Sequence, residues 1–486
     1  MRILYLDLDT LRPDHLGCYG YARDTSPNID SIAREGVRFE NCYVSDAPCL
    51  PSRSGLYQCR FGIHTGVVDH GGFAADPFPE GYPARGFRMS EERLGWMGRL
   101  RKAGFHTASI SPFAERHSAW WFCEGFNETH NTGKTGNERA DEVAPVALDW
   151  IRRNAKRDPW FLQVNFWDSH AVYRTPKEYG NPFAGKPAPS WHTEEVRRAH
   201  WDGFGMRSAQ EPHGDFGAKG RCPRMPDQIA SLDDFRMWID GYDVGTRYMD
   251  DHIGLLFAEL RRQGVWDDLV ILISSDHGEN LGELNIYGDH HTADHVTSRV
   301  PLIVRWPGVT TPRVDRALHY QCDFAATVTE LAGGQCSPRW DARSFADAFR
   351  AGRDAGRDSL VVSQCAWSCQ RSVRFDDFIA IRTYHDGLKN FPEWMLFDVT
   401  ADPHETKDLA PSKPELVGRA SRMLDAWVAE QMRTSVSGID PLWTVIHSGG
   451  PFHTRGLGEP YCAHLRATGR AHHAEAIERR HGRAKP

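Results

Sequence analysis

The sequence predicts an α/β protein with a large, mostly parallel sheet sandwiched by helices and a smaller C-terminal antiparallel sheet-plus-helix subdomain. Short apolar runs rich in β-forming residues lack polar alternation, as expected of strands that are buried on both faces. Helical patterns separate these runs, which is the βαβ order of a parallel sheet. Acidic or imidazole side chains follow the last residue of several runs.

The elements of the large sheet alternate along the first two thirds of the chain. The expected strands lie at residues 3–8, 105–111, 160–167, 269–273 and 300–306. The expected helices lie at residues 26–35, 90–103, 139–156 and 243–263. The last helix carries apolar residues at helical spacing, which is typical of a helix that packs one face on a core.

The pattern changes after about Gly352. Strands are expected at residues 359–363, 378–383 and 394–398, and a helix at residues 413–434. We therefore expect a large domain over residues 1–352, and a subdomain with a tail over residues 353–486. The tail beyond Gly449 is rich in histidine and arginine, and it either packs over a functional site or caps a partner subunit.

Residues 179–234 interrupt the alternation with a long segment rich in proline, glycine, histidine and charge. The segment is too long for a simple connection between two elements of a compact domain. We expect it to cross the surface and to form a wall of the substrate site. A disordered insert is the alternative.

Composition excludes several classes of protein. The net charge is −7 with acids and bases interspersed, which argues against a nucleic-acid-binding protein. No window of the sequence approaches the length of a membrane span. The first residues run directly into a strand pattern without a signal peptide, so we expect a cytoplasmic protein. The eleven cysteines show no disulfide or zinc spacing.

Three expected strands deliver polar groups at their carboxyl ends. The first strand is followed by Asp9, the strand at 160–167 by Asp168 and His170, and the strand at 269–273 by Asp276 and His277. Open α/β sheets place their sites at this edge. The alternative is that aspartate simply marks the end of a strand. This explains one such case more easily than three, so we expect these side chains to converge on one site.

The segment from Ala47 to Gly55 reads APCLPSRSG and carries the most specific pattern in the chain. A cysteine phosphatase loop needs five residues between Cys and Arg, and only three separate Cys49 from Arg53. A buried structural cysteine is the plain alternative. Cys-x-Pro-Ser-Arg resembles the signature of the type I, formylglycine-dependent sulfatases of the alkaline phosphatase superfamily.

This resemblance implies a nucleophile and a metal site. In the family the cysteine is oxidised to formylglycine by a formylglycine-generating enzyme, so Cys49 would be the precursor of the nucleophile and a metal ligand. Arg53 would contact it from one helical turn away. Asp9, Asp276 and His277 would hold one divalent ion. Calcium comes first on family grounds, with manganese close behind because of the imidazole ligand.

The chain departs from the family pattern at several positions. Asp9 aligns with the first of two adjacent family aspartates, and Thr10 replaces the second. Asp7, two residues before Asp9 on the same strand face, is a candidate to supply the missing carboxylate and ranks below Asp9 as a ligand. Asp-His in place of Asp-Asn resembles the choline-sulfatase and phosphonate-hydrolase branch. Two family lysines are absent.

Four histidines are candidates for the remaining roles. We expect His117 to contact the sulfate in place of one missing lysine and His290 to act as acid in place of the other. His170, in a segment that resembles the family's His-x-Pro-Tyr, is the best single candidate for the proton donor and for sulfate contacts. His70 falls where the phosphonate-hydrolase branch binds substrate.

The resemblance implies a hydrolase that releases inorganic sulfate and an alcohol from a small-molecule or saccharide sulfate ester. A phosphonate or phosphate monoester hydrolase with the same nucleophile and metal is the alternative. A non-catalytic relative that binds sulfated ligands is disfavoured because the nucleophile and the metal carboxylates are present. The sequence leaves the oligomeric state open, a homo-oligomer included.

Overall fold

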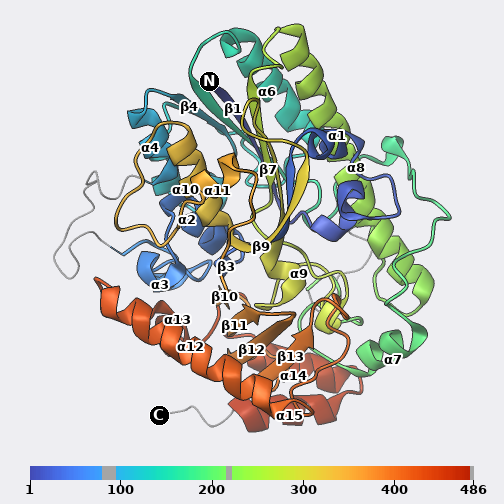
Figure 1. The fold of residues 1–486 in the computed structure, drawn as a ribbon. Helices are drawn as coiled ribbons and strands as arrows, with labels where there is room; N and C mark the ends of the chain where they lie inside the picture. Colours follow the sequence, from blue (N-terminus) through green and yellow to red (C-terminus); the bar gives the residue numbers. More distant parts are fainter. Residues whose placement is uncertain (79–94, 215–221, 482–486) are drawn as a thin grey trace.

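The chain folds around an eight-stranded sheet, seen in a computed structural model that describes residues 1–78, 95–214 and 222–481 (Figure 1). Its strand order is β5-β4-β6-β1-β7-β8-β2-β9. The strands are β1 Arg2–Leu8, β2 Val37–Tyr43, β4 His106–Ile110, β5 Glu128–His130, β6 Trp160–Phe166, β7 Leu269–Ser274, β8 Arg299–Arg305 and β9 Arg313–Tyr320. All neighbours are parallel except those of β8, which runs antiparallel to β7 and β2. The predicted α/β fold class is therefore confirmed.

Helices cover both faces of this sheet because successive side chains of each strand point to opposite faces and both sets are apolar. In β1, Ile3 and Tyr5 join the core on one face, and Leu4 and Leu6 join the core on the other. The first core includes helices α2, α4 and α10, and the second includes α1, α6 and α8 (Figure 1). These helices are α1 Pro27–Glu35, α2 Cys49–Gln58, α4 Trp96–Lys102, α6 Ala140–Asn154, α8 Leu232–Arg262 and α10 Gln321–Leu331.

Two expected helices differ in extent from the observed ones. The helix expected at 243–263 begins at Leu232, because the hydroxyl of Ser231 accepts a hydrogen bond from the amide of Asp234 and caps the first turn. The helix expected at 90–103 begins at Trp96, after Gly95 in an extended conformation, and residues 90–94 lie outside the described part of the chain.

A second, five-stranded sheet has the order β13-β12-β11-β10-β3. Its strands are β3 Asp46–Ala47, β10 Ser359–Gln364, β11 Cys369–Phe375, β12 Phe378–His385 and β13 Trp394–Asp398, with α12 Pro414–Thr434 packed against them. The expected antiparallel C-terminal subdomain is confirmed. The short strand β3 lies directly before Cys49 and pairs in parallel with β10, so the two sheets meet at the start of α2.

Several described segments outside the two sheets have buried side chains of their own. Residues of the 179–234 segment, including Phe183, Met206 and Ile229, are buried. The longer helices outside the sheets are α7 Glu194–Asp202, α13 Pro441–His447, α14 Gly458–Ala467 and α15 Ala471–His481. Short helical turns are α3 Gly62–Thr65, α5 Phe113–Arg116, α9 His295–Ser298, α11 Ala346–Arg350, η1 Pro13–His15, η2 Gly17–Tyr19, η3 Gly72–Ala74, η4 Trp120–Cys123, η5 Lys177–Tyr179 and η6 Glu283–Asn285. Among the helices described, none combines the length and apolar character that crossing a bilayer requires.

Shortening a side chain inside the large sheet should destabilise the protein. Leu162 in β6 is fully buried, and Leu162→Ala should lower the free energy of unfolding by about 2–5 kcal/mol because it removes contacts and leaves a cavity. Leu255→Ala, the same change at an exposed position of α8, should cost less than about 0.5 kcal/mol. Urea unfolding followed by circular dichroism compares the two, and equal losses would contradict the assigned core.

Candidate active site

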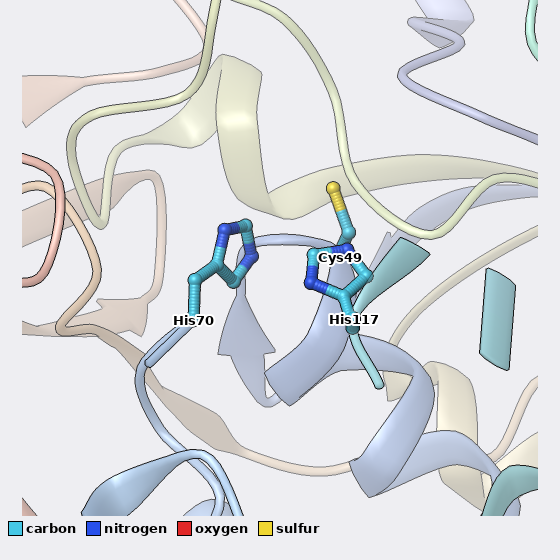
Figure 2. A group of neighbouring side chains, drawn as sticks. All are labelled: Cys49, His70 and His117. Carbon is cyan, nitrogen blue, oxygen red and sulfur yellow. The ribbon is translucent and has the colours of Figure 1, made fainter. Parts of the chain in front are cut away.

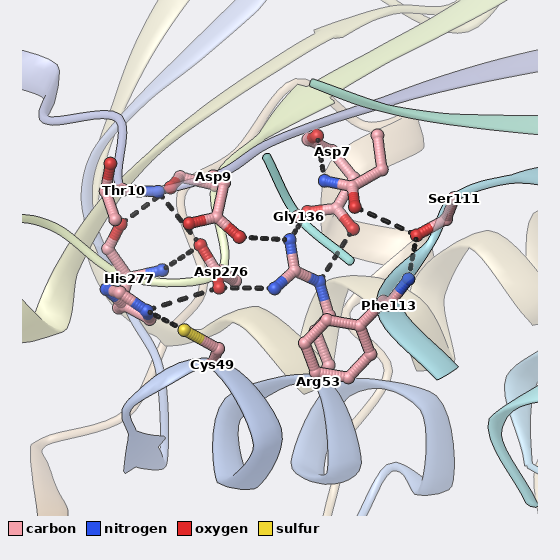
Figure 3. Close-up of polar contacts among 12 residues, drawn as sticks. Asp7, Asp9, Thr10, Cys49, Arg53, Ser111, Phe113, Gly136, Asp276 and His277 are labelled. Carbon is pink, nitrogen blue, oxygen red and sulfur yellow. Dashed lines mark hydrogen bonds and ion pairs between the residues drawn. The ribbon is translucent and has the colours of Figure 1, made fainter. Parts of the chain in front are cut away.

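Residues from three separate segments meet at the carboxyl edge of the large sheet (Figure 3). Asp9 follows β1, Asp276 and His277 follow the neighbouring strand β7, and Cys49 is the first residue of α2. One side-chain oxygen, nitrogen or sulfur atom of each of these four residues lies within 4.8 Å of the corresponding atoms of the others, and all four residues are buried. The structure therefore brings together the four residues that the sequence nominated as metal ligands.

The guanidinium of Arg53 lies among three buried carboxylates (Figure 3). It contacts Asp7 through Nε at 2.9 Å and through Nη2 at 3.1 Å. Its Nη2 lies 3.0 Å from Oδ2 of Asp9, and its Nη1 lies 2.5 Å from Oδ2 of Asp276. Asp7 is outside the group of converging ligand atoms, so it does not replace the carboxylate lost at Thr10.

Helix α2 places Arg53 one turn beyond Cys49, so both side chains project to the same side. The Arg53 guanidinium carbon lies 4.5 Å from the ring centre of Phe113 and 5.5 Å from that of Trp167. The Ser52 hydroxyl donates to the backbone oxygen of Asp276, which ties the helix to the end of β7. These contacts fix the helix start against the strand ends.

The protonation of His277 is set by its backbone neighbour. Its Nδ1 lies 2.7 Å from the carbonyl oxygen of Gly278, which can only accept, so Nδ1 carries the proton. Nε2 is then unprotonated. It lies 3.0 Å from the sulfur of Cys49 and 3.3 Å from Oδ2 of Asp276. Burial lowers the pKa of His277 and favours this neutral form, which is the form that binds metals.

The donor set fits a divalent cation. Asp7, Asp9 and Asp276 bring three negative charges against one from Arg53, which would leave a buried excess of two if all three were ionised. Asp9 Oδ1 is buried without a hydrogen-bond partner, and burial, then Asp276, raises the pKa of Asp9 well above its usual range. Two carboxylates and an imidazole suit calcium, magnesium or manganese. Asp9, Asp276 and His277 would hold such an ion beside residue 49.

Imidazole rings lie on two sides of Cys49. His70 and His117 lie beside the sulfur, with ligand atoms within 4.8 Å of it and of each other (Figure 2). His290 lies on the side of His277, with ring centres 4.0 Å apart. His170 lies beyond His290, and the centres of these two rings are 6.0 Å apart. Burial lowers the pKa of each of these histidines, so they are neutral in this arrangement.

The sequence model of the family described as Sulfatase matches residues 2–334, more than half of the chain. The chain belongs to the sulfatase family. It is a family of sulfuric ester hydrolases, and the expected enzyme class is confirmed.

Several sulfatases and related hydrolases cover nearly the full length of this sulfatase. N-acetylglucosamine-6-O-sulfatase of Bacteroides thetaiotaomicron is 22% identical over 92% of this chain and 89% of its own. The multifunctional alkaline phosphatase superfamily protein PehA of Trinickia caryophylli is 23% identical over 83% of this chain and 89% of its own.

Solved structures show the same fold. A protein in complex with its substrate D-glucosamine-2-N,6-O-disulfate has a TM-score of 0.68 at 19% identity and covers 89% of this chain and 98% of its own. Phosphonate monoester hydrolase of Agrobacterium radiobacter has a TM-score of 0.66 at 18% identity and covers 88% of this chain and 96% of its own.

The C-terminal tail of this sulfatase adds residues that sequence reasoning missed. His453 Nε2 lies 2.9 Å from Nδ1 of His70, so one ring donates to the other and the orientation of His70 is fixed. Trp367, between β10 and β11, stacks on His453 and on His291, with ring centres 4.4 Å and 3.9 Å apart. The tail was expected either to pack over a functional site or to cap a partner subunit. The part around His453 packs over the site. The richness of the tail in histidine was the available signal.

Adding a divalent cation to metal-free protein should raise its stability. The ion relieves the excess of negative charge around Arg53, and at a hundredfold excess over its dissociation constant it should contribute about 2.7 kcal/mol. Asp9→Asn should remove most of the increase in Tm measured with calcium or manganese. Asp268→Asn, at an exposed position, should keep it. An undiminished increase in the Asp9 variant would show that the ion binds elsewhere.

Proposed function

We propose that this sulfatase hydrolyses sulfate monoesters at residue 49 after Cys49 has been converted to formylglycine by a formylglycine-generating enzyme. One observation carries the proposal: the sulfur of Cys49 and one ligand atom each of Asp9, Asp276 and His277 lie within 4.8 Å of one another. A nucleophile beside a divalent cation is the arrangement that attack on an anionic sulfate requires.

The thiol of Cys49 is unsuited to act by itself. Burial first, and then Asp9 and Asp276, raise its pKa well above the usual range. A buried neutral thiol is a poor nucleophile because the thiolate is the reactive form. The hydrated aldehyde of formylglycine supplies one hydroxyl that attacks sulfur and a second that allows sulfate to be expelled.

The surrounding side chains have distinct tasks. Arg53 orients Asp9 and Asp276 and contributes fixed positive charge next to residue 49. A bound divalent ion, with calcium first and manganese close behind, would polarise the sulfate oxygens. His70 and His117 would hold the sulfate from the other side of residue 49, and His290 or His170 would protonate the leaving alcohol.

Two classes of substrate are candidates. Relatives whose names specify N-acetylglucosamine 6-sulfate favour a sulfated saccharide. Hydrolysis of a phosphonate or phosphate monoester is the second candidate, because the fold is shared with phosphonate monoester hydrolases and the Asp276-His277 pair is present. Rates of the modified protein on matched sulfate and phosphonate esters distinguish them.

Changing residue 49 should abolish turnover. Mass analysis of the peptide that contains Cys49 should show the aldehyde in active preparations, and Cys49→Ala should lower kcat/KM by at least about 10³-fold because the nucleophile is lost. Cys336→Ala, at an exposed cysteine, should leave the rate unchanged. Full activity in protein whose Cys49 is an unaltered thiol would refute the proposal.

The leaving alcohol should reveal which histidine donates the proton. Removing the acid slows esters of poor leaving groups by about 10²-fold but barely slows 4-nitrophenyl sulfate, whose leaving group needs no proton. His290→Ala should show this dependence more strongly than His170→Ala, with exposed His472→Ala as the control. A loss that is the same for all leaving groups would mark either residue as a positioning residue.

A further inference from the structure

Two arginines outside the metal group lack a carboxylate partner among the described residues. Arg116 and Arg174 form no ion pair there, whereas Arg53 contacts three carboxylates and Arg207 lies 2.7 Å from Asp289. Both arginines bind the same loop, at residues 135 and 137, and burial, followed by the charge of Arg116, lowers the pKa of Arg174. A protein stabilises such a pair by binding an anion between them.

The pair is held in place by neutral contacts from one loop. Arg116 Nη1 donates to the carbonyl oxygen of Thr135 at 3.0 Å, and Arg174 Nη2 donates to the side chain of Asn137 at 2.8 Å. The guanidinium carbon of Arg116 also lies 5.1 Å from the ring centre of Trp167. These contacts leave donors of both arginines free and do not neutralise either charge.

Trp167 links the pair to the proposed sulfate site. The guanidinium carbons of Arg116 and Arg53 lie 5.1 Å and 5.5 Å from the centre of its ring. Arg116 therefore lies near Arg53 and residue 49, and the loop of residues 135–137 connects Arg174 to Arg116. Burial raises the pKa of Asp168 to about 7, and Asp168 makes no ion pair in the described chain.

We propose that Arg116 and Arg174 form a second anion-binding site beside residue 49, and that the substrate carries a second anionic group, a sulfate or a carboxylate, next to the sulfate that is cleaved. This inference rests on the proposed function. A sulfate monoester has a single negative charge, which the metal site and Arg53 already attract. Arg116 reaches toward that sulfate, and Arg174 selects the second group.

Binding measured without turnover tests the second site. Metal-loaded Cys49→Ser protein is titrated calorimetrically with glucosamine 6-O-sulfate and with glucosamine-2-N,6-O-disulfate, and in a second arm with a sulfated uronate and its methyl ester. In at least one arm the doubly charged ligand should bind about tenfold more tightly, as expected for one added charge-assisted contact. The arm that shows the preference identifies the second group as sulfate or carboxylate.

The variant Arg174→Gln should erase this preference and leave the affinity for the singly charged ligand within about threefold, because only the second contact is lost. Arg116→Gln should weaken both ligands. Arg153→Gln, an exposed arginine of α6, is the matched control and should change neither affinity. Equal affinities in both arms, or a preference that survives Arg174→Gln, would overturn the second site. Failure of the proposed function appears separately, as modified enzyme that turns over no sulfate ester.

Discussion

The site depends on an imbalance of buried charge. Arg53 is shared by Asp7, Asp9 and Asp276, and one guanidinium cannot neutralise three carboxylates. Removing ions from water costs several kcal/mol each unless they are paired, so the group requires either protons or a further cation. Burial raises the pKa of Asp9, which favours its protonated form, and a divalent ion held by Asp9, Asp276 and His277 would be the alternative. The arrangement that stabilises the start of α2 would therefore also hold a metal ion.

The connection between the two sheets explains how Cys49 is held. Strand β3 pairs with β10 through Asp46 and Ala47, two residues before the cysteine. Helix α2 then begins at Cys49 and is fixed by Arg53 on the side of the large sheet. The C-terminal subdomain also contributes His453, which orients His70. Residue 49 is thus positioned from both sheets, and the small subdomain helps to shape the site.

Much of this site could be predicted because its residues follow buried parallel strands. Asp9, Asp276 and His277 were found from strand ends and from a motif, and the order of the sheet brings β1 and β7 together. The partners of Arg53 and the contact between His70 and His453 join residues far apart in sequence, and no local pattern specifies them. The first turns of α8, before residue 243, were missed because Gly241 interrupts the helical pattern there. Glycine is needed at this position, since an added Cβ would come within 2.4 Å of the backbone oxygen of Arg224.

The protonation states around residue 49 suggest why fixed charge is supplied by arginine. Loss of contact with water lowers the pKa of His70, His117 and His290, and Arg116 adds to this effect at His70 and His117, so these rings are neutral when no anion is bound. A neutral imidazole can orient a sulfate or gain a proton as an anion arrives, but it attracts that anion weakly from a distance. Arginine remains charged even where burial and a neighbouring cation lower its pKa, as at Arg174. Arg116 and Arg174 would therefore attract an anionic substrate, and the histidines would act once its charge has entered the site.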